Sequence, residues 1–338
     1  MKIAIIGTGG IAHYHARAIP KTGAELWAIC DVSAQALEGF GDEYGVERRY
    51  SSVEEMLAHE GLDIAIVSTW GVFHARTCDQ IARSRRVRAI LCEKPFCTDA
   101  SEAREMIRVA RDHQVLLAEA FKFRHHPQHL KAKELVEAGR IGPLQAIRST
   151  FTVAAHPAYR TPAHNWRFDP ARGGGAIYDL GCYNIHHARF IAGTEPVRVY
   201  ACAQWGTASG VEESVAALLE FPGGLTAQLS LSFRCASSEW VELHGEGGLL
   251  RYERAWNVEN HPRENHPAVL VVRGQDGSAE RYEFPPVDQF ALQLRHLIRC
   301  LETGEPHRIP PENSLGNMQV IDALFASMKS GQPVTLSP

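Results

Sequence analysis

The sequence lacks several features that would indicate a disulfide-rich, membrane or nucleic-acid-binding protein. Its eight cysteines include no C-x-x-C pair, which indicates buried free thiols in a reducing compartment such as the cytoplasm, rather than a disulfide or zinc framework. No apolar run is long enough to span a membrane, and no signal peptide precedes the first expected strand. The net charge of −4 provides no strong basic field. Neither a membrane nor a nucleic acid is therefore expected as a partner.

The length of 338 residues is large for a single core and favours two domains. Short apolar runs alternate with helical patterns up to about residue 121, which is typical of a doubly wound parallel sheet. Longer strands joined by tight turns follow, and from about residue 197 they indicate an antiparallel sheet. We therefore expect an α/β chain with a dinucleotide-binding Rossmann domain at 1–121 and a substrate-binding and oligomerisation α+β domain at 122–338.

A glycine motif follows the first expected strand at once. Gly7-Thr8-Gly9-Gly10-Ile11-Ala12 has the G-x-G-x-x-G/A form and leads into a helical pattern. Gly7 permits a tight turn, Gly9 allows close approach of a pyrophosphate, and Ala12 allows close packing of helix on strand. The N–H groups that open the helix, including those of Gly10 and Ile11, would face the phosphates.

An acidic residue ends the second expected strand, a little over twenty residues after Gly9. Asp31 is placed to accept hydrogen bonds from ribose hydroxyls and to repel a 2′-phosphate. The next residues, 32–36, include no arginine that would bind such a phosphate. NAD is therefore favoured as the cofactor, with NADP possible. The third expected strand ends in Ser68-Thr69-Trp70-Gly71, where Thr69 could line the cofactor.

A further apolar run, 89–92, ends in Glu93-Lys94-Pro95. Ligands of open α/β sheets bind just beyond the carboxyl ends of the strands, so Lys94 is placed beside cofactor or substrate. Pro95 removes a backbone donor and stops the strand sharply.

A second glycine-rich segment lies in the second domain. Gly173-Gly174-Gly175 permits a special turn or a close backbone approach, and a helical pattern follows. Asp179 and Tyr183 are four residues apart and would share one helical face, with His187 one further turn along. The alternative is a hydrogen-bonded core pair. His187 and the preceding Arg167 are candidates for contacting substrate.

Two histidines, His125 and His129, have the spacing of metal ligands one helical turn apart. No third ligand is evident in the sequence, and transfer of a hydride to a bound nucleotide needs no metal. No metal site is therefore expected.

Taken together, these motifs resemble the glucose–fructose oxidoreductase/inositol dehydrogenase family of NAD(P)-dependent oxidoreductases. Four motifs carry the resemblance, namely the glycine motif at 7–12, Glu93-Lys94-Pro95, Gly139-Arg140-Ile141-Gly142, and the glycine run at 173–175 that leads to Asp179 and Tyr183. The family implies a large, open antiparallel sheet in the second domain, often used for assembly into homodimers or homotetramers. It implies catalytic roles for Lys94, Asp179 and Tyr183, and cofactor contacts at Glu93 and Lys94. His74 matches the family's position, although the segment 68–73 departs from the usual Thr-Pro-Asn.

The chemistry that the resemblance implies is hydride transfer between a nicotinamide cofactor and a secondary hydroxyl or carbonyl of a sugar or polyol. A tyrosine base would need its pKa of about 10 lowered by ~2–3 units, and an ammonium group ~4 Å away supplies about that much. The Lys94 ammonium would thus activate Tyr183, and Asp179 would orient Lys94 or the substrate. Two alternatives stay open, an NAD-dependent glycosidase on the same fold and a non-catalytic NAD-binding sensor.

Overall fold

The computed structural model describes residues 1–257 and 267–336, and the chain divides into two compact units. The first comprises Met1–Lys122 and Asp288–Met318, and the second comprises Phe123–Val287 and Gln319–Pro338. The first unit thus includes a late segment that the sequence analysis assigned to the second domain. The reason is hydrophobic, because Leu294 and Leu297 are fully buried in the same core as the first strands.

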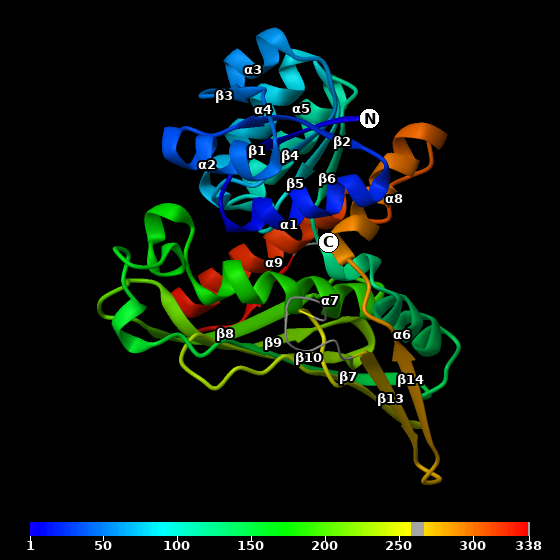
Figure 1. Cartoon of the computed structure of the whole chain (residues 1–338). Coiled ribbons are helices and arrows are strands. Elements are labelled where there is room, and N and C mark those ends of the chain that lie inside the picture. The colour runs from blue at the N-terminus through cyan, green and yellow to red at the C-terminus, as the bar shows by residue number, and fades with distance from the viewer. Residues whose placement is uncertain (258–266, 337–338) are drawn as a thin grey trace. The chain divides into compact units, whose positions relative to one another are not determined.

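The first unit is built on a six-stranded parallel sheet with the strand order β3-β2-β1-β4-β5-β6 (Figure 1). Its strands are β1 (Lys2–Ile6), β2 (Glu25–Cys30), β3 (Arg49–Tyr50), β4 (Leu62–Val67), β5 (Val87–Cys92) and β6 (Leu116–Glu119). This confirms the predicted doubly wound sheet. The strand order reverses between β1 and β4, and the carboxyl ends at such a switch point are where open α/β sheets bind their ligands.

The helices of this unit begin in two ways, some at a side-chain cap and some without one. They are α1 (Gly10–Ala18), α2 (Ala34–Tyr44), α3 (Val53–His59), α4 (His74–Ser84), α5 (Ala100–Asp112) and α8 (Gln289–Thr303). Ser52 Oγ accepts the N–H of Glu55 at 3.2 Å, and Asp99 Oδ1 accepts the N–H of Glu102 at 2.8 Å. Both caps have the capping-box spacing, in which a glutamate follows three residues after the capping residue, and both satisfy N–H groups that have no partner within the helix.

The second unit is built on a nine-stranded sheet with the order β14-β13-β12-β11-β7-β10-β9-β8-β15. Its strands are β7 (Leu144–Thr152), β8 (Arg198–Trp205), β9 (Glu212–Glu220), β10 (Thr226–Ser232), β11 (Val241–Gly245), β12 (Gly248–Tyr252), β13 (Ala268–Gly274), β14 (Ala279–Phe284) and β15 (Val334–Thr335). Neighbours are antiparallel except β7 and β10, which pair in parallel. The sheet is therefore mainly antiparallel, as expected.

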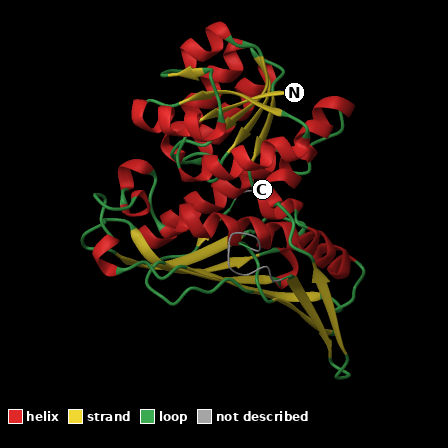
Figure 2. Cartoon of the chain, viewed as in Figure 1, coloured by secondary structure: helices red, strands yellow, loops and turns green. Residues whose placement is uncertain are grey.

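Helices α6 (Pro127–Glu137) and α7 (Cys182–Ala192) lie along one face of this sheet (Figures 1 and 2). A last helix, α9 (Pro311–Ser330), contributes residues to both units. Along β10 the buried residues Ala227, Leu229 and Leu231 alternate with the exposed Gln228 and Ser230, so one face is core and the other is polar or half-buried. Among residues 1–257 and 267–336, no helix combines the length and the apolar character that crossing a membrane requires.

Candidate active site

The turn that follows β1 can pack against the neighbouring backbone because Gly7 has no side chain. Gly7 has a φ of 90°, and a Cβ there would lie 2.8 Å from the backbone nitrogen of Thr69 on the neighbouring β4 segment. A Cβ at Gly9 or Gly10, in contrast, would meet nothing within 4 Å. Gly7 is therefore required by the packing of the turn, whereas Gly9 and Gly10 leave open space in front of α1.

The N-terminus of α1 is suited to an anionic group. Its N-cap Gly9 provides no side-chain oxygen, and the first turn contains no acidic residue. The first N–H groups are thus not satisfied by a side-chain cap, and the helix dipole adds a partial positive charge. Ile11 packs against Ala18 and the Phe290 cluster of α8, which fixes the helix behind these N–H groups. This arrangement fits the pyrophosphate of a dinucleotide.

Asp31 lies directly beside the glycine turn. Its Oδ2 accepts the N–H of Thr8 at 2.7 Å and the Thr8 hydroxyl at 3.0 Å, and its Oδ1 accepts the N–H of Ser33 at 2.8 Å. Each carboxylate oxygen has about two lone pairs, so the group can still accept from a ribose hydroxyl. The next residue, Val32, is 93% exposed. Asp31 therefore has a structural task, fastening the glycine turn to β2, that the sequence pattern did not reveal.

Two of the predicted cofactor residues near the end of β4, Thr69 and His74, lie in contact. His74 Nε2 lies 3.0 Å from the carbonyl oxygen of Thr69, and its Nδ1 lies 2.9 Å from that of Pro95. Burial lowers the pKa of the His74 imidazole, so the neutral ring donates its single N–H to one carbonyl at a time. His74 is itself 1% exposed. It links the loop that follows β4 to the loop that follows β5. The rings of Trp70 and Phe73, which are exposed, have their centroids 6.2 Å apart.

Glu93 is the buried centre of the Glu93-Lys94-Pro95 segment. Its Oε1 lies 2.7 Å from His15 Nε2, and its Oε2 accepts the N–H of Lys94 at 3.1 Å. Burial alone would raise the pKa of the Glu93 carboxyl, but the hydrogen bond and charge of His15, together with Lys94, outweigh burial and lower that pKa. The ionised carboxylate therefore holds the Lys94 backbone. The peptide bond between Lys94 and Pro95 is cis.

Sequence reasoning missed His15. It is fully buried on the face of α1 that also buries Ala12 and Ala16. A histidine on the apolar face of the helix that follows the glycine turn was the available signal, because a buried imidazole requires a polar partner. That partner, Glu93, is 78 residues away in the chain, so the pairing could not be read from spacing.

In the second unit the structure brings together Asp179, Tyr183 and Arg167. Arg167 Nε donates to Asp179 Oδ2 at 2.6 Å, and the Asp179 side chain is only 6% exposed. The Asp179 charge raises the pKa of the Arg167 guanidinium, burial opposes that shift, and Tyr183 adds to it. The guanidinium is therefore close to both candidate catalytic groups. Sequence reasoning had named all three residues but had not paired Arg167 with Asp179.

The helix that carries this pair does not begin as an α-helix. Ile177–Gly181 forms a π-helical turn, and α7 starts only at Cys182. A Cβ at Gly181 would lie 2.7 Å from Leu231 Cδ1 on β10, so the wide turn packs close to the sheet. Single π-helical turns are frequent at functional sites. The spacing of four between Asp179 and Tyr183 thus spans a change of helix type, and the two residues do not share the regular α-helical register that was predicted.

His187, the remaining predicted substrate residue, is fully buried. Its Nε2 lies 3.1 Å from the hydroxyl oxygen of Tyr252, and its ring packs edge-on against Trp256. Burial, with a smaller effect of the Arg124 charge, lowers the pKa of His187 to about 3. At neutral pH the ring is uncharged and packed in the core of the unit, and its substrate role stays a prediction.

The predicted pair of possible metal ligands includes His129, whose Nε2 lies 2.8 Å from the carbonyl oxygen of Ala255. A different group, His296, Cys300 and Glu305 in the first unit, places its ligand atoms within 4.8 Å of one another. However, His296 Nε2 accepts the N–H of Arg308 at 2.9 Å, and Arg299 donates to Glu305 at 2.5 Å. These contacts and the two positive charges disfavour a cation there.

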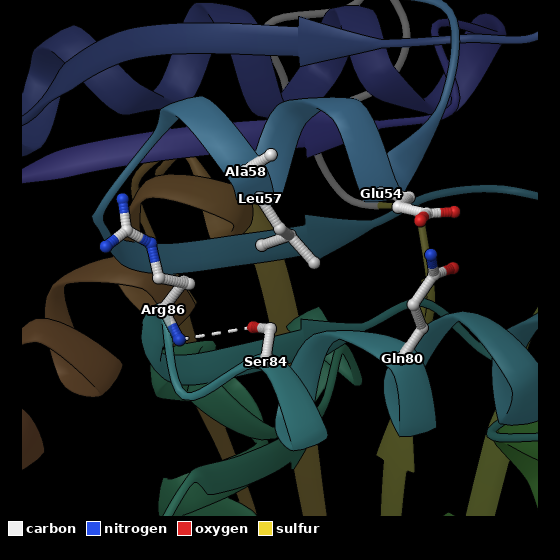
Figure 3. A pocket seen from close by; sticks show the side chains of 6 residues that line it. All are labelled: Glu54, Leu57, Ala58, Gln80, Ser84 and Arg86. Atoms are coloured by element: carbon white, nitrogen blue, oxygen red, sulfur yellow. Dashed lines mark hydrogen bonds between the residues drawn. The ribbon is translucent and has the colours of Figure 1, made fainter.

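Two surface hollows lie elsewhere on the first unit. One, of about 440 Å³, lies between α3 and α4, where Leu57 projects toward the groove and the N–H of Arg86 donates to Ser84 Oγ (Figure 3). The other, of about 820 Å³, borders the start of β5 and the end of α8. Neither is lined by a predicted site residue, and both lie near the amino ends of strands, whereas ligands of such sheets bind at the carboxyl ends.

Comparison with known proteins agrees with the motifs. Residues 1–121 match the model of the oxidoreductase family with an NAD-binding Rossmann fold, and residues 129–251 match the GFO/IDH/MocA C-terminal domain. The D-xylose 1-dehydrogenase (NADP(+)) 2 of Haloferax volcanii is 31% identical over 99% of this chain and 100% of its own. The dTDP-3,4-didehydro-2,6-dideoxy-alpha-D-glucose 3-reductase of Actinomadura kijaniata is 29% identical, over 96% of this chain and 94% of its own.

A solved structure extends the likeness to the fold. The crystal structure of a 3-ketoreductase from Actinomadura kijaniata in complex with NADP and TDP-benzene superimposes with a TM-score of 0.86 at 28% identity, covering 97% of each chain. The two family models and the relatives agree on one family. The glycine turn and the uncapped N-terminus of α1 agree with the dinucleotide-binding domain of that family. The chain belongs to the GFO/IDH/MocA family and is an NAD(P)-dependent oxidoreductase whose Rossmann unit binds the dinucleotide.

Proposed function

We propose that the substrate is a sugar or a polyol, that Tyr183 is the proton acceptor and donor, and that Lys94 and Asp179 assist it. One observation carries the assignment of Tyr183, namely that the guanidinium of Arg167, which donates to the buried Asp179, also interacts electrostatically with Tyr183. A fixed cation beside a phenol stabilises the phenolate that general-base catalysis requires. The sugar or polyol class is supported by relatives named for xylose, a deoxy sugar nucleotide and inositol.

The proposed roles divide between the atoms of these side chains. The bound nicotinamide accepts the hydride from the substrate carbon or returns it. Tyr183 Oη accepts the hydroxyl proton in the oxidative direction, and the Lys94 ammonium donates to the same substrate oxygen. Asp179 holds Arg167 through the 2.6 Å bond from Nε, which leaves the guanidinium's other N–H groups on a partly exposed side chain for the neighbouring substrate hydroxyls.

The direct test is a panel of sugars and polyols, supplied with NAD and with NADP and followed at the nicotinamide absorbance. We expect stoichiometric reduction of the dinucleotide with at least one pentose, hexose or inositol. Formation of a cleaved glycoside without net reduction would instead support the glycosidase alternative. Dinucleotide binding without turnover of any alcohol or carbonyl would support the sensor.

We further propose that NAD is preferred over NADP because of Asp31. Replacing Asp31 by Asn keeps an oxygen that accepts the Thr8 N–H but removes the charge. The loss of a charge-assisted bond to the ribose and of the repulsion of a 2′-phosphate should lower the NAD-to-NADP affinity ratio by about tenfold, or about 1.4 kcal/mol. Fluorescence titration of both dinucleotides measures this ratio.

A second variant separates specificity from loop structure. Asp31→Ala also removes the oxygen that accepts both the N–H and the hydroxyl of Thr8, so it should weaken the binding of both dinucleotides in addition to changing the ratio. Equal or tighter binding of NADP by the unaltered protein would show that the NAD preference is wrong.

The assembly is proposed to be a homodimer or homotetramer formed through the face of the nine-stranded sheet opposite α6 and α7. Tyr200 pairs across the strands with Leu218, and Leu218 pairs with Gln228, so an aromatic and an aliphatic side chain lie side by side on that face. Tyr200 is 40% exposed, and burying such a face against a second copy removes apolar surface from water. Light scattering at micromolar protein should give a multiple of 37.4 kDa, and Leu218→Lys should shift it toward the monomer. A monomeric unaltered protein would contradict the proposal.

We also infer that the protein works in a reducing compartment such as the cytoplasm. All eight cysteines are free thiols, and six of them are buried. Chains that fold in oxidising compartments typically use their cysteines in disulfides.

A further inference from the structure

A buried carboxylate lies beneath the glycine run that leads to Asp179. Glu212 is the first residue of β9 and is 2% exposed. Its Oε1 accepts the N–H of Ile177 at 2.9 Å, which is the first N–H of the π-helical turn. An acidic group at the N-terminal end of a helical segment satisfies a donor that the helix leaves unpaired and interacts favourably with its dipole.

The glycine run is shaped around this carboxylate. Gly175 has a φ of 122°, and a Cβ there would lie 2.3 Å from Glu212 Oε1 and 2.6 Å from Oε2. A Cβ at Gly174 would lie 2.7 Å from the carbonyl oxygen of Arg167. The run therefore fits between the Glu212 side chain on one side and the Arg167 backbone on the other. Two of the three glycines are thus required by contacts within the protein.

The same contacts lead to the candidate catalytic groups. The N–H of Gly175 donates to the carbonyl oxygen of Arg167 at 2.9 Å, and the N–H of Asp179 donates to that of Gly175 at 3.2 Å. Arg167 in turn donates to the Asp179 carboxylate. Glu212 thus binds the start of the turn that carries Asp179. Arg167 contacts that turn twice, through its carbonyl oxygen and through its guanidinium.

We propose that Glu212 is a positioning residue of the reaction, whose carboxylate fixes the turn that presents Asp179 and Tyr183. This inference rests on the proposed function of those two residues. Glu212 acts through the Ile177 N–H and takes no part in proton or hydride transfer itself.

The position of Glu212 also makes the turn sensitive to pH. Burial raises the pKa of the Glu212 carboxyl to about 7, although the Ile177 N–H opposes the shift. The charged groups around it are paired elsewhere. Glu213 contacts Arg160 and Arg234, and across the turn Arg167 is bonded to Asp179.

The consequence for turnover follows from the strength of the Ile177 bond. A carboxylate accepts an N–H about twice as strongly as a neutral carboxyl does, so the hydrogen bond to Ile177 becomes stronger as the pH rises through about 7. We therefore expect that ionisation of Glu212 contributes to the increase of turnover with pH. Since the pKa of the folded state lies above that of an ordinary carboxyl, ionisation of Glu212 at higher pH costs stability.

The test is Glu212→Gln, which keeps the shape and an accepting oxygen but cannot ionise. We expect kcat at pH 8 to fall about fivefold to tenfold with KM for the sugar nearly unchanged, because a charge-assisted bond is replaced by a neutral one. The part of the kcat–pH profile centred near 7 should disappear. Thermal stability at pH 8 should be equal or higher, since the buried charge is gone.

The matched control is Glu220→Gln at the far end of β9, where the carboxylate pairs with Arg198 at 2.7 Å. It should keep both kcat and the pH profile of the unaltered enzyme. A second measurement is the profile of the residual activity of Tyr183→Phe. If the component near pH 7 belongs to Glu212 it persists there, and if it belongs to Tyr183 it is lost.

These outcomes separate two failures. If Tyr183→Phe lowers turnover as expected while Glu212→Gln keeps the original kcat and pH profile, the positioning role is wrong and the proposed function stands. If Tyr183→Phe has no effect on turnover, the proposed function itself fails. Loss of the component near pH 7 in Tyr183→Phe would also overturn the role of Glu212, even if Glu212→Gln could not be folded.

Discussion

Replacing Tyr183 by phenylalanine is expected to lower turnover by ~10²–10⁴-fold, the usual worth of a general acid–base group. The ring is 7% exposed and packs against Phe151 at 5.7 Å and Trp256 at 5.9 Å between centroids. Phenylalanine keeps that packing and removes only the hydroxyl, so the fold and the dinucleotide affinity should hardly change. Steady-state kinetics with the best sugar of the panel, together with a titration of NAD, measure the two effects separately.

His187 provides the comparison. It lies one turn further along α7, is fully buried, and interacts with Tyr252. His187→Gln keeps a polar side chain at that position and should retain most of the turnover, since a packed ring whose pKa is about 3 is a poor base near neutral pH. If Tyr183→Phe turned over normally while a folded His187→Gln did not, the proton would pass through His187 and the assignment of Tyr183 would be wrong.

Replacing Lys94 by alanine should lower turnover at least as far as Tyr183→Phe. The substitution removes both a donor to the substrate oxygen and a positive charge that favours the phenolate. The backbone of Lys94 is held by Glu93, and Glu93 by His15, so the loop itself should remain in place. Lys94→Met, which keeps the length of the side chain, should be as poor as Lys94→Ala if the charge is what matters.

A double mutant tests whether the two groups work on one reaction. Lys94→Ala combined with Tyr183→Phe should be little worse than the worse single variant, as is found for catalytic groups that act as a unit. Lys131→Ala is a suitable control, because Lys131 forms a surface pair with Glu134 on α6. Losses that multiply in the double variant would mean that Lys94 and Tyr183 contribute independently.

The parts of the fold that sequence predicted well are those specified by neighbours in the chain. The strand, glycine turn and helix at residues 2–18 follow from local patterns, and so do the caps at Ser52 and Asp99. The parallel pairing of β7 with β10 was not predicted, because about seventy residues separate the two strands and alternation of burial is the same in either direction. The hairpins β11–β12 and β13–β14 were expected only as general architecture.

The candidate site shows the same division. Lys94, Asp179 and Tyr183 could be named because motifs mark them, whereas their partners could not. The partner of Arg167, Asp179, lies in the π-helical turn, and a helical period of 3.6 residues does not predict such a turn. His15 and Glu212 belong to no motif, and each forms a tertiary hydrogen bond to a residue far along the chain.

The bond between Thr8 and Asp31 has a consequence for how this protein could change over evolutionary time. One carboxylate fastens the glycine turn, and in the function we propose it also faces the ribose. A lineage that drifted toward the phosphorylated dinucleotide by losing the acid would first pass through a form whose turn is loose and which binds either nucleotide poorly. Substitutions at positions 8 and 31 are therefore expected to be epistatic. A designer who exchanges the cofactor would have to supply a new anchor for Thr8 together with the new charge.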